Sequence, residues 1–395
     1  MVLAMVGLVV AGSAVTMSAC TATGHGATGI RLEKIMTSPN WRDGKFVNLL
    51  QSEQASLAEF FGKWMRGADN TAPESPPPIM KRAAGDFDVA PSSGLRITWL
   101  GHSTFLVEIN GQRVLVDPVF SERPSPLTWI GPARFHEIPL SIEDLPAIDA
   151  VVISHDHYDH LDHRTVLALG ERVPLYIVPL GVGARLESWG VPGQRIVERD
   201  WWQEFRLGGL MFTATPARHF SGRSLVMADQ NETLWSGWVI ASQDHRVYYS
   251  GDTGMFPGFT AIGERLGPFD AVLIETGAYD QLWADLHIGP EQAIEARVAL
   301  GSGLFIPVHW GTFDLAMHGW TEPVERVLVA AERAGVPIAV PLPGESIEPA
   351  SPPRLSRWWP SVPWLTAEDT PIVSSGIEQP WRTAQKPKTL VGTTR

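Results

Sequence analysis

One short stretch gathers much of the chain's potential chemistry. Residues 154–162 read Ser-His-Asp-His-Tyr-Asp-His-Leu-Asp and contain three imidazoles and three carboxylates. They follow the apolar residues 150–153, whose length and β-branched content are typical of a buried strand. Functional groups often lie where such a strand ends in layered α/β proteins. A solvated polar loop does not require this spacing, and we therefore interpret the stretch as a chemical site.

The spacing H-x-H-x-D-H indicates metal binding. Neutral imidazole and carboxylate are ligands of borderline divalent metals, and zinc takes about four ligands per ion. A turn at this point would direct His155 and His157 to one side of an ion and Asp159 and His160 toward a second ion. Two ions need more than four ligands, so further His and Asp residues should follow other strands.

Such residues are present downstream. His219 follows a β-prone run, Asp252 lies in the turn Ser-Gly-Asp-Thr-Gly, and His309 follows Ile-Pro-Val. Each alone is a weak indication, because His and Asp at strand ends are often ordinary turn or capping residues. Their order after H-x-H-x-D-H makes the combination specific.

The elements that would position these side chains form two kinds of pattern. Short β-prone runs at 95–100, 104–109 and 113–116 come first, and Asn110-Gly111 between two of them is a strong hairpin signal. Strands and helices alternate later, so we expect two sheets with helices outside them, an α/β layered fold. The later predicted strands are 173–179, 195–197, 211–215, 233–241, 246–249, 271–275, 304–308 and 338–340, and the predicted helices are 49–65, 163–169, 180–189, 290–300 and 322–334.

Composition excludes some classes of function. The chain has 395 residues, 44% of them hydrophobic, which is enough for a full globular core. The formal net charge of −12 argues against a nucleic-acid partner, because phosphate backbones are bound by clustered Lys and Arg. It also disfavours purely electrostatic docking to an anionic membrane, but not an apolar or lipid anchor.

The first twenty residues predict export. Residues 1–19 contain no charged side chain, and Met17-Ser18-Ala19-Cys20 resembles a bacterial lipobox. Cys20 is the only cysteine, so cysteine ligation of a metal and intrachain disulfides are both excluded. We expect residues 1–20 to be a signal peptide, with membrane association through lipidated Cys20 in a bacterial cell envelope. An uncleaved apolar tail or a misplaced start codon is the alternative, which would leave the protein cytoplasmic.

The remaining regions are expected as follows. Within residues 21–90, we expect 21–29 to form a tether and the rest to form an ordered lead-in. Residues 91–350 are expected to form a catalytic domain. Residues 351–395 are rich in Pro and Trp without a helical or strand period, which predicts an irregular extension packed on the domain through its tryptophans.

The combined motifs resemble the metallo-β-lactamase superfamily, and residues 97–346 resemble its N-acylphosphatidylethanolamine-hydrolysing phospholipase D group. That resemblance implies an αββα sandwich with one or two metals at the sheet edges. The stretches that carry it, besides the residues 148–162 that include the metal motif, are Trp99-Leu100-Gly101-His102, Asp117-Pro118-Val119-Phe120-Ser121, Asp200-Trp201-Trp202, Gly251-Asp252-Thr253-Gly254, Gly267-Pro268-Phe269-Asp270, Gly277-Ala278-Tyr279 and His309-Trp310-Gly311-Thr312-Phe313.

The resemblance also implies roles for individual residues. Two zinc ions would be bound, and Tyr158 and His287 would contact the substrate phosphate. His102, His163 and Asp117 are expected to support ligands rather than to be ligands. The implied ligands are His155, His157 and His219 for the first zinc, Asp159, His160 and His309 for the second, and Asp252 as a bridge between them.

The implied function is hydrolysis of a phosphodiester in a phospholipid, with an N-acylethanolamine as leaving group and a phosphatidic acid as the other product. Asp159 would take a proton from the attacking water, and His287 or a water molecule would protonate the leaving alkoxide. An alternative enzyme is a lactonase or sugar-phosphate hydrolase of the ascorbate-phosphate lactonase branch. A cell-envelope binding protein with a structural metal is less compatible, because structural zinc sites are closed by four ligands that usually include Cys.

Overall fold

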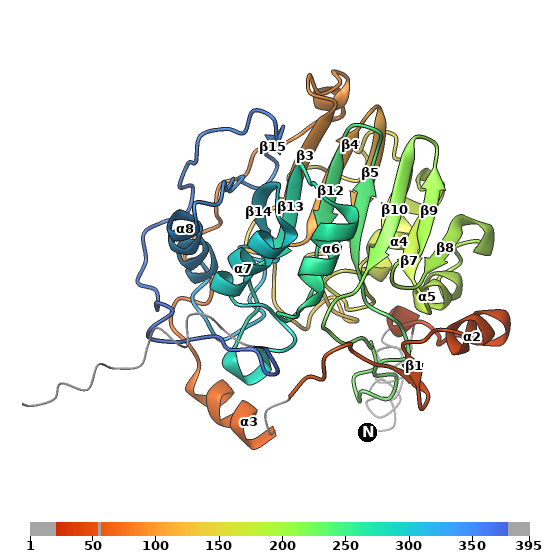
Figure 1. The fold of residues 1–395 in the computed structure, drawn as a ribbon, viewed down its shortest axis with the longest axis horizontal. Coiled ribbons are helices and arrows are strands. Elements are labelled where there is room, and N and C mark those ends of the chain that lie inside the picture. The colour runs from red at the N-terminus through yellow and green to blue at the C-terminus, as the bar shows by residue number, and fades with distance from the viewer. Residues whose placement is uncertain (1–20, 54–56, 378–395) are drawn as a thin grey trace, which may run out of the picture.

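The computed structural model describes residues 21–53 and 57–377. Two β-sheets pack face to face, and helices cover both outer faces (Figure 1). The prediction of two sheets with helices outside them is therefore confirmed. No helix in the described part of the chain is long and apolar enough to cross a membrane.

The first sheet carries the metal motif. In the described chain its strand order is β15-β3-β4-β5-β6-β7-β8, and the neighbours from β5 to β8 run parallel. Its strands are β3 (Leu95–Gly101), β4 (Thr104–Ile109), β5 (Gln112–Val116), β6 (Ala150–Val152), β7 (Tyr176–Pro179), β8 (Ile196–Arg199) and β15 (Ser346–Ile347).

The second sheet has the order β14-β13-β12-β11-β10-β9 among the described residues. Strands β12, β13 and β14 are parallel, and β11 is antiparallel to both β10 and β12, so β10 runs in the direction of β12. Its strands are β9 (Glu204–Leu207), β10 (Leu210–Thr215), β11 (Gly237–Ala241), β12 (Arg246–Tyr249), β13 (Ala271–Glu275) and β14 (Leu304–Val308).

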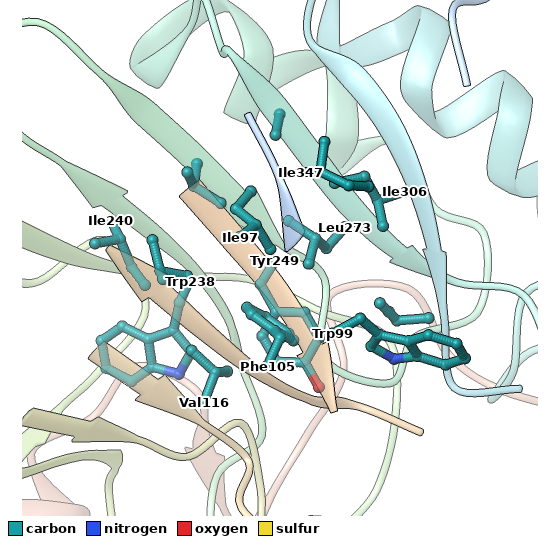
Figure 2. Close-up of a cluster of buried hydrophobic side chains, with 14 of the residues drawn as sticks. Ile97, Trp99, Phe105, Val116, Trp238, Ile240, Tyr249, Leu273, Ile306 and Ile347 are labelled. Atoms are coloured by element: carbon teal, nitrogen blue, oxygen red, sulfur yellow. The ribbon is translucent and has the colours of Figure 1, made fainter. Parts of the chain in front are cut away.

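A continuous apolar core fills the space between the sheets. Figure 2 shows Trp99 and Phe105 of the first sheet beside Tyr249 and Leu273 of the second, all of them buried. The alternation of side chains along each strand sends one set into this core and the other set toward the helices. The core therefore fixes the position of the strand ends of one sheet relative to those of the other.

Helices cover the outer faces through apolar contacts. Helices α4 (His163–Leu169) and α5 (Val182–Ser188) pack on the first sheet. Helices α6 (Gly258–Leu266), α7 (Pro290–Leu300) and α8 (Glu322–Ala334) pack on the second. This arrangement is an αββα sandwich.

Several predicted elements differ from the observed ones. Residues 338–340 form only an isolated bridge from Ile338 to Phe305, not a strand. Within the range 49–65, residues 49–53 have no helix, and α3 spans Leu57–Arg66. Strand β9, helix α6 and strand β15 were not predicted.

The N-terminal segment lies against the sandwich. Cys20 and the rest of residues 1–20 are outside the described residues, but 21–29, expected as a tether, contacts the domain. The Trp189 indole donates to Thr21 O at 2.8 Å, and Ala22 is buried. Helix α2 (Gly29–Met36) and the hairpin of β1 (Trp41–Arg42) and β2 (Lys45–Phe46) follow, and α2 and α3 lie beyond the same edge of the sheets (Figure 1).

The C-terminal segment also crosses the sandwich. Residues 351–377 contain turns but neither helix nor strand. Trp358 stacks on Trp310 with ring centroids 5.3 Å apart, and the indole of buried Trp359 donates to Glu325 at 2.8 Å. Trp381 lies outside the described residues.

Candidate metal centre

The strand directions bring the predicted ligands to one edge of the sandwich. His155 follows β6 of the first sheet, whereas His219, Asp252 and His309 follow β10, β12 and β14 of the second. Since those three strands run in the same direction, their carboxyl ends share an edge. The seven predicted ligands gather there in two groups that border on Asp252.

The first group contains His155, His157, His219 and Asp252, whose ligand atoms all lie within 4.8 Å of one another. His157 Nδ1 is 2.8 Å from His155 Nε2 and 3.3 Å from His219 Nε2. The nearest Asp252 oxygen is 3.7 Å from both His155 Nε2 and His219 Nε2.

The second group contains Asp159, His160 and His309 together with His102. Asp159 Oδ2 lies 3.5 Å from His160 Nε2 and 3.3 Å from His309 Nε2. Asp252 faces this group as well, at 3.1 Å from each of the two imidazoles. Asp252 therefore lies between the groups, where the predicted bridge would be.

The donor atoms fit divalent cations. His160 Nε2 and Asp252 Oδ1 are buried and lack a hydrogen-bond partner among the described residues. Burial lowers the pKa of His155 and of His219 well below the ordinary value, so both imidazoles are neutral and offer lone pairs. Burial opposes ionisation of Asp252, but the imidazoles of His160 and His309 hold its pKa well below the ordinary value. Burial opposes protonation of His160 and His309, but Asp252 and Asp159 raise the pKa of both imidazoles, and a bound divalent cation would take the place of these protons.

Asp117, at the end of β5, fixes the orientation of His160. Its Oδ2 lies 2.7 Å from His160 Nδ1 and accepts from the Tyr249 hydroxyl at 2.6 Å, while its Oδ1 accepts from Ser154 N at 2.7 Å. His160 is thereby held with Nε2 toward Asp252. This contact is the supporting role expected of Asp117.

The backbone around Asp252 requires glycine. Gly251 has φ +59°, and a Cβ there would lie 2.8 Å from Ser236 O and 2.9 Å from Ser154 Cβ. A side chain at this position would push the turn that carries Asp252 away from the metal motif.

His219 is held by two distant segments. Asn48 of the N-terminal segment accepts from His219 N at 3.0 Å and donates to His219 O at 2.8 Å. The ring's Nδ1 lies 2.8 Å from Leu286 O, so donation to that carbonyl leaves Nε2 free toward Asp252. Asn48 could not be identified from the sequence, because its partner is 171 residues away.

Glu275 is a site residue that was not predicted. It ends β13, is fully buried, and its Oε2 lies 2.9 Å from His287 Nδ1. Burial and the nearby Asp252 carboxylate raise its pKa. Glu275 could have been identified from its position, because it is a carboxylate at the end of the apolar strand Ala-Val-Leu-Ile-Glu.

The structure brings His287 to the metal ligands. Its Nδ1 is 3.9 Å from Asp252 Oδ2, and its ring lies 4.9 Å from that of His219. The side chain is 16% exposed, unlike the buried His219. His287 therefore reaches both the ligand groups and the solvent side of the site.

Tyr158 contacts Arg223, a residue outside the metal motif. Its hydroxyl donates to Arg223 O at 2.8 Å, and the Arg223 guanidinium lies 4.0 Å from the ring centroid. The side chain thus joins the metal motif to the segment after His219, and a phosphate contact remains a prediction. His163 begins α4 and packs on Trp189 at 5.0 Å, whereas His102 lies 3.0 Å from Asp159 as a supporting residue would.

A buried ion pair ties both terminal segments to the loops of His219 and His287. Arg218 Nη2 lies 2.9 Å from Asp285 Oδ2 and also contacts Gln51 O. Asp285 accepts from Ser375 N at 2.6 Å and from Glu53 N at 2.8 Å. The edges of the site are therefore completed by residues far from the metal motif.

A hollow beside His309 is lined mainly by aromatic and aliphatic side chains. The polar residues Thr71 and His318 also line it, and its volume of about 10 Å³ admits about one water molecule. The lining residues include Phe135, Ala278, Trp310, Phe313, Leu315 and Trp320.

Comparison with known proteins agrees with this geometry. The family model described as "Beta-lactamase superfamily domain" matches residues 112–310. An uncharacterized protein of Mycobacterium tuberculosis is 49% identical over 336 residues, covering 82% of this chain and 87% of its own. The N-acyl-phosphatidylethanolamine-hydrolyzing phospholipase D 1 of Caenorhabditis elegans is 37% identical over 260 residues, covering 63% of this chain and 72% of its own.

A solved structure shares the fold. The isothiocyanate hydrolase from Delia radicum gut bacteria gives a TM-score of 0.52 at 23% identity, over 64% of this chain and 98% of that one. At this identity the likeness concerns the fold alone.

Proposed function

The chain belongs to the metallo-β-lactamase superfamily, within the group similar to N-acylphosphatidylethanolamine-hydrolysing phospholipase D, and we propose that it is a dinuclear zinc phosphodiesterase. It is a metal-dependent hydrolase, and the proposal concerns its metals and substrate. The proposed reaction cleaves N-acylphosphatidylethanolamine-type phospholipids into N-acylethanolamine and phosphatidic acid.

The observation that carries the proposal is the pair of ligand groups that meet at Asp252. His155, His157 and His219 would hold one zinc, and Asp159, His160 and His309 the other, as the family resemblance implies. When bound, such a metal pair supplies hydroxide near neutral pH and neutralises charge on phosphate oxygens.

The chain's own residues provide proton transfer. Asp159 is 17% exposed and its Oδ2 faces His160 and His309, so it can accept the proton of the attacking water. His287 reaches the solvent side and can donate a proton from Nε2 to the leaving alkoxide. Glu275 positions His287 through Nδ1, at 2.9 Å.

The deciding experiment offers the purified protein three substrates with and without a chelator. N-acylphosphatidylethanolamine should be cleaved to N-acylethanolamine and phosphatidic acid, and the chelator should abolish cleavage. A generic phosphodiester should be cleaved more slowly. Turnover of a lactone panel without diester cleavage would contradict the proposal and favour the lactonase alternative.

Location in the cell envelope is part of the proposal. A lipid anchor at Cys20 would hold the enzyme at the surface that contains its substrate. Cys20→Ser should move the protein from the membrane fraction to the soluble fraction on cell fractionation. Continued membrane retention of that variant would contradict the anchor.

A further inference from the structure

Two loops present consecutive apolar side chains to solvent. Leu225, Val226 and Met227 are 70%, 82% and 54% exposed, and Trp129 and Ile130 are 64% and 46% exposed. We call these five residues the apolar rim. Scattered exposed apolar residues are ordinary, but three in succession are unfavourable in water unless they bind something.

The first loop is fixed on the metal motif. Gly222 N donates to Asp156 Oδ1 at 2.9 Å, and Arg223 Nη1 donates to Leu161 O at 2.7 Å. Asp229 closes the loop by accepting from Ser224 N at 2.9 Å. The chain passes from ligand His219 to the exposed Leu225 in six residues, so the apolar tip lies close to the site.

The second loop is fixed on the other end of the same motif. Ser121 N donates to Asp162 Oδ2 at 3.0 Å, and Arg164 Nη2 donates to Arg123 O at 2.9 Å. Both loops are therefore hydrogen-bonded to residues 156–164, which contain or follow predicted metal ligands. Arg134 N donates to Glu122 O and Phe135 N to Thr312 O, both at 2.8 Å, so the loop that carries Trp129 and Ile130 closes beside the segment after predicted ligand His309.

The described segment that follows the predicted lipidation site contacts the first loop. Arg223 Nη2 donates to Ala22 O at 2.8 Å. Ala22 is therefore held against the base of the first loop, and it follows the predicted lipidation site by two positions in the sequence.

We propose that the apolar rim inserts into the interfacial layer of a phospholipid bilayer and turns the metal centre toward the lipid head groups. This inference rests on the proposed function and names the surface by which the enzyme meets its substrate. The net charge of −12 disfavours electrostatic attraction, so apolar insertion provides the binding. A tryptophan such as Trp129 suits the boundary between head groups and acyl chains.

A second copy of the chain is a poorer occupant. A stable protein interface uses about 20 residues on each side, many more than the five residues of the apolar rim. A bilayer accepts separate tips, because each can insert independently.

The absence of a second cysteine allows a direct test. In the full chain with Cys20→Ser, Val226→Cys or Val89→Cys introduces the only thiol, which can carry a fluorescent probe. Val89 is a matched control: it is 74% exposed and precedes β3, whose far end at Gly101 leads into the site, so it lies at the opposite edge. Phosphatidylcholine vesicles containing quenchers in the acyl chains should quench the probe at 226 and leave the probe at 89 bright.

Equal responses at the two positions, or no response at either, would overturn the proposal. A response at 226 that depends on protein concentration but not on vesicles would identify a second copy as the occupant and also overturn it. Because quenching requires no catalysis, its result is independent of the substrate assay.

A kinetic comparison uses substitutions instead of probes. Val226→Asp should lower hydrolysis of vesicle phospholipid by about tenfold, since it removes an apolar contact and inserts a charge. The same variant should cleave a water-soluble phosphodiester at the wild-type rate, and Val89→Asp should leave both rates unchanged. Equal loss on both substrates for Val226→Asp would show damage to the site rather than loss of a membrane contact.

Discussion

Asp252 is the residue on which the two ligand groups depend together. Its carboxylate lies 3.1 Å from His160 and from His309 and 3.7 Å from His155 and from His219. Asp252→Ala should therefore remove both metals, because each group loses its shared negative ligand. Metal analysis should give well under one ion per chain, and about two ions would contradict the bridging role. Asp314→Ala, at an exposed carboxylate, is the control.

His287 is expected to act on the substrate rather than on the metals. It contacts Glu275 and lies near Asp252, but it is more exposed than the predicted ligands His155 and His219. His287→Ala should keep the metal content and lower kcat by roughly 100-fold, the effect of losing a general acid. His25→Ala, at an exposed histidine, should change neither quantity. An unchanged kcat for His287→Ala would place it outside the reaction.

At the scale of single residues, the sequence predicted side chains whose motifs are local. Four of them, His155, His157, Asp159 and His160, lie within six positions. Their place in one metal site could therefore be predicted from the sequence. Glu275 could not be identified in this way, because its partners Thr253, Ile288 and His287 come together only through the parallel pairing of β12 and β13. The Tyr158 hydroxyl contacts Arg223, a partner that its place within the motif did not reveal.

The N-terminal segment acts on the site through Asn48. Asn48→Ala removes two hydrogen bonds to the His219 main chain and should lower the free energy of unfolding by about 2 kcal/mol. Metal affinity should fall about tenfold, the smaller effect seen when a supporting group is lost.

Gln112→Ala provides a matched control for Asn48→Ala. Gln112 also binds main chain through its amide, at Leu207 O and Gly209 N, but far from the metal ligands. Denaturant unfolding should show a comparable loss for both variants, whereas metal titration should distinguish them. Equal metal affinities would show that Asn48 contributes to stability alone.

Helix α7 contains a carboxyl group that titrates near neutrality. Burial and the nearby Glu291 raise the pKa of Glu295 to about 7. Between pH 4.5 and 7 the folded protein keeps a proton that the unfolded chain releases, so this group makes stability fall as pH rises through that range. Glu295→Gln should remove the fall, raising the urea midpoint at pH 8 relative to wild type and less so at pH 4.5. Glu332→Gln, exposed on α8, should show no such difference.

At the scale of elements, predictions succeeded where the local pattern was strong. Helix α4 begins at His163 as predicted, with Asp162 accepting from Arg164 N as its cap. Helix α6 was missed because its sequence has two glycines, which disfavour helix, and packing of Phe259 and Ile262 stabilises it instead. Strand β9 alternates only between exposed and half-buried residues, so it lacks the apolar pattern of a core strand.

The metal centre joins the two halves of the molecule. His155 follows a strand of the first sheet, while His219 and His309 follow strands of the second. Bound metal should therefore stabilise the whole sandwich, and a chelator should lower the unfolding temperature by several degrees. Calorimetry with chelator alone and with zinc-saturated chelator tests this, and equal transitions would contradict it.

The layered architecture of the whole molecule could be predicted, because a given order of strands and helices along the chain allows only a few arrangements of sheets and helices. How residues 21–53 and 351–377 cross the sandwich was not predictable. Their contacts, such as Arg218 with Ser375, join positions 157 residues apart and have no local pattern.

The contact of Ser375 with Asp285 has a consequence for biosynthesis. Ser375 is made after every predicted ligand, yet it holds the loop that presents His287. The loop that presents His287 is therefore completed later in synthesis than the strands of both sheets, by a segment that belongs to neither sheet.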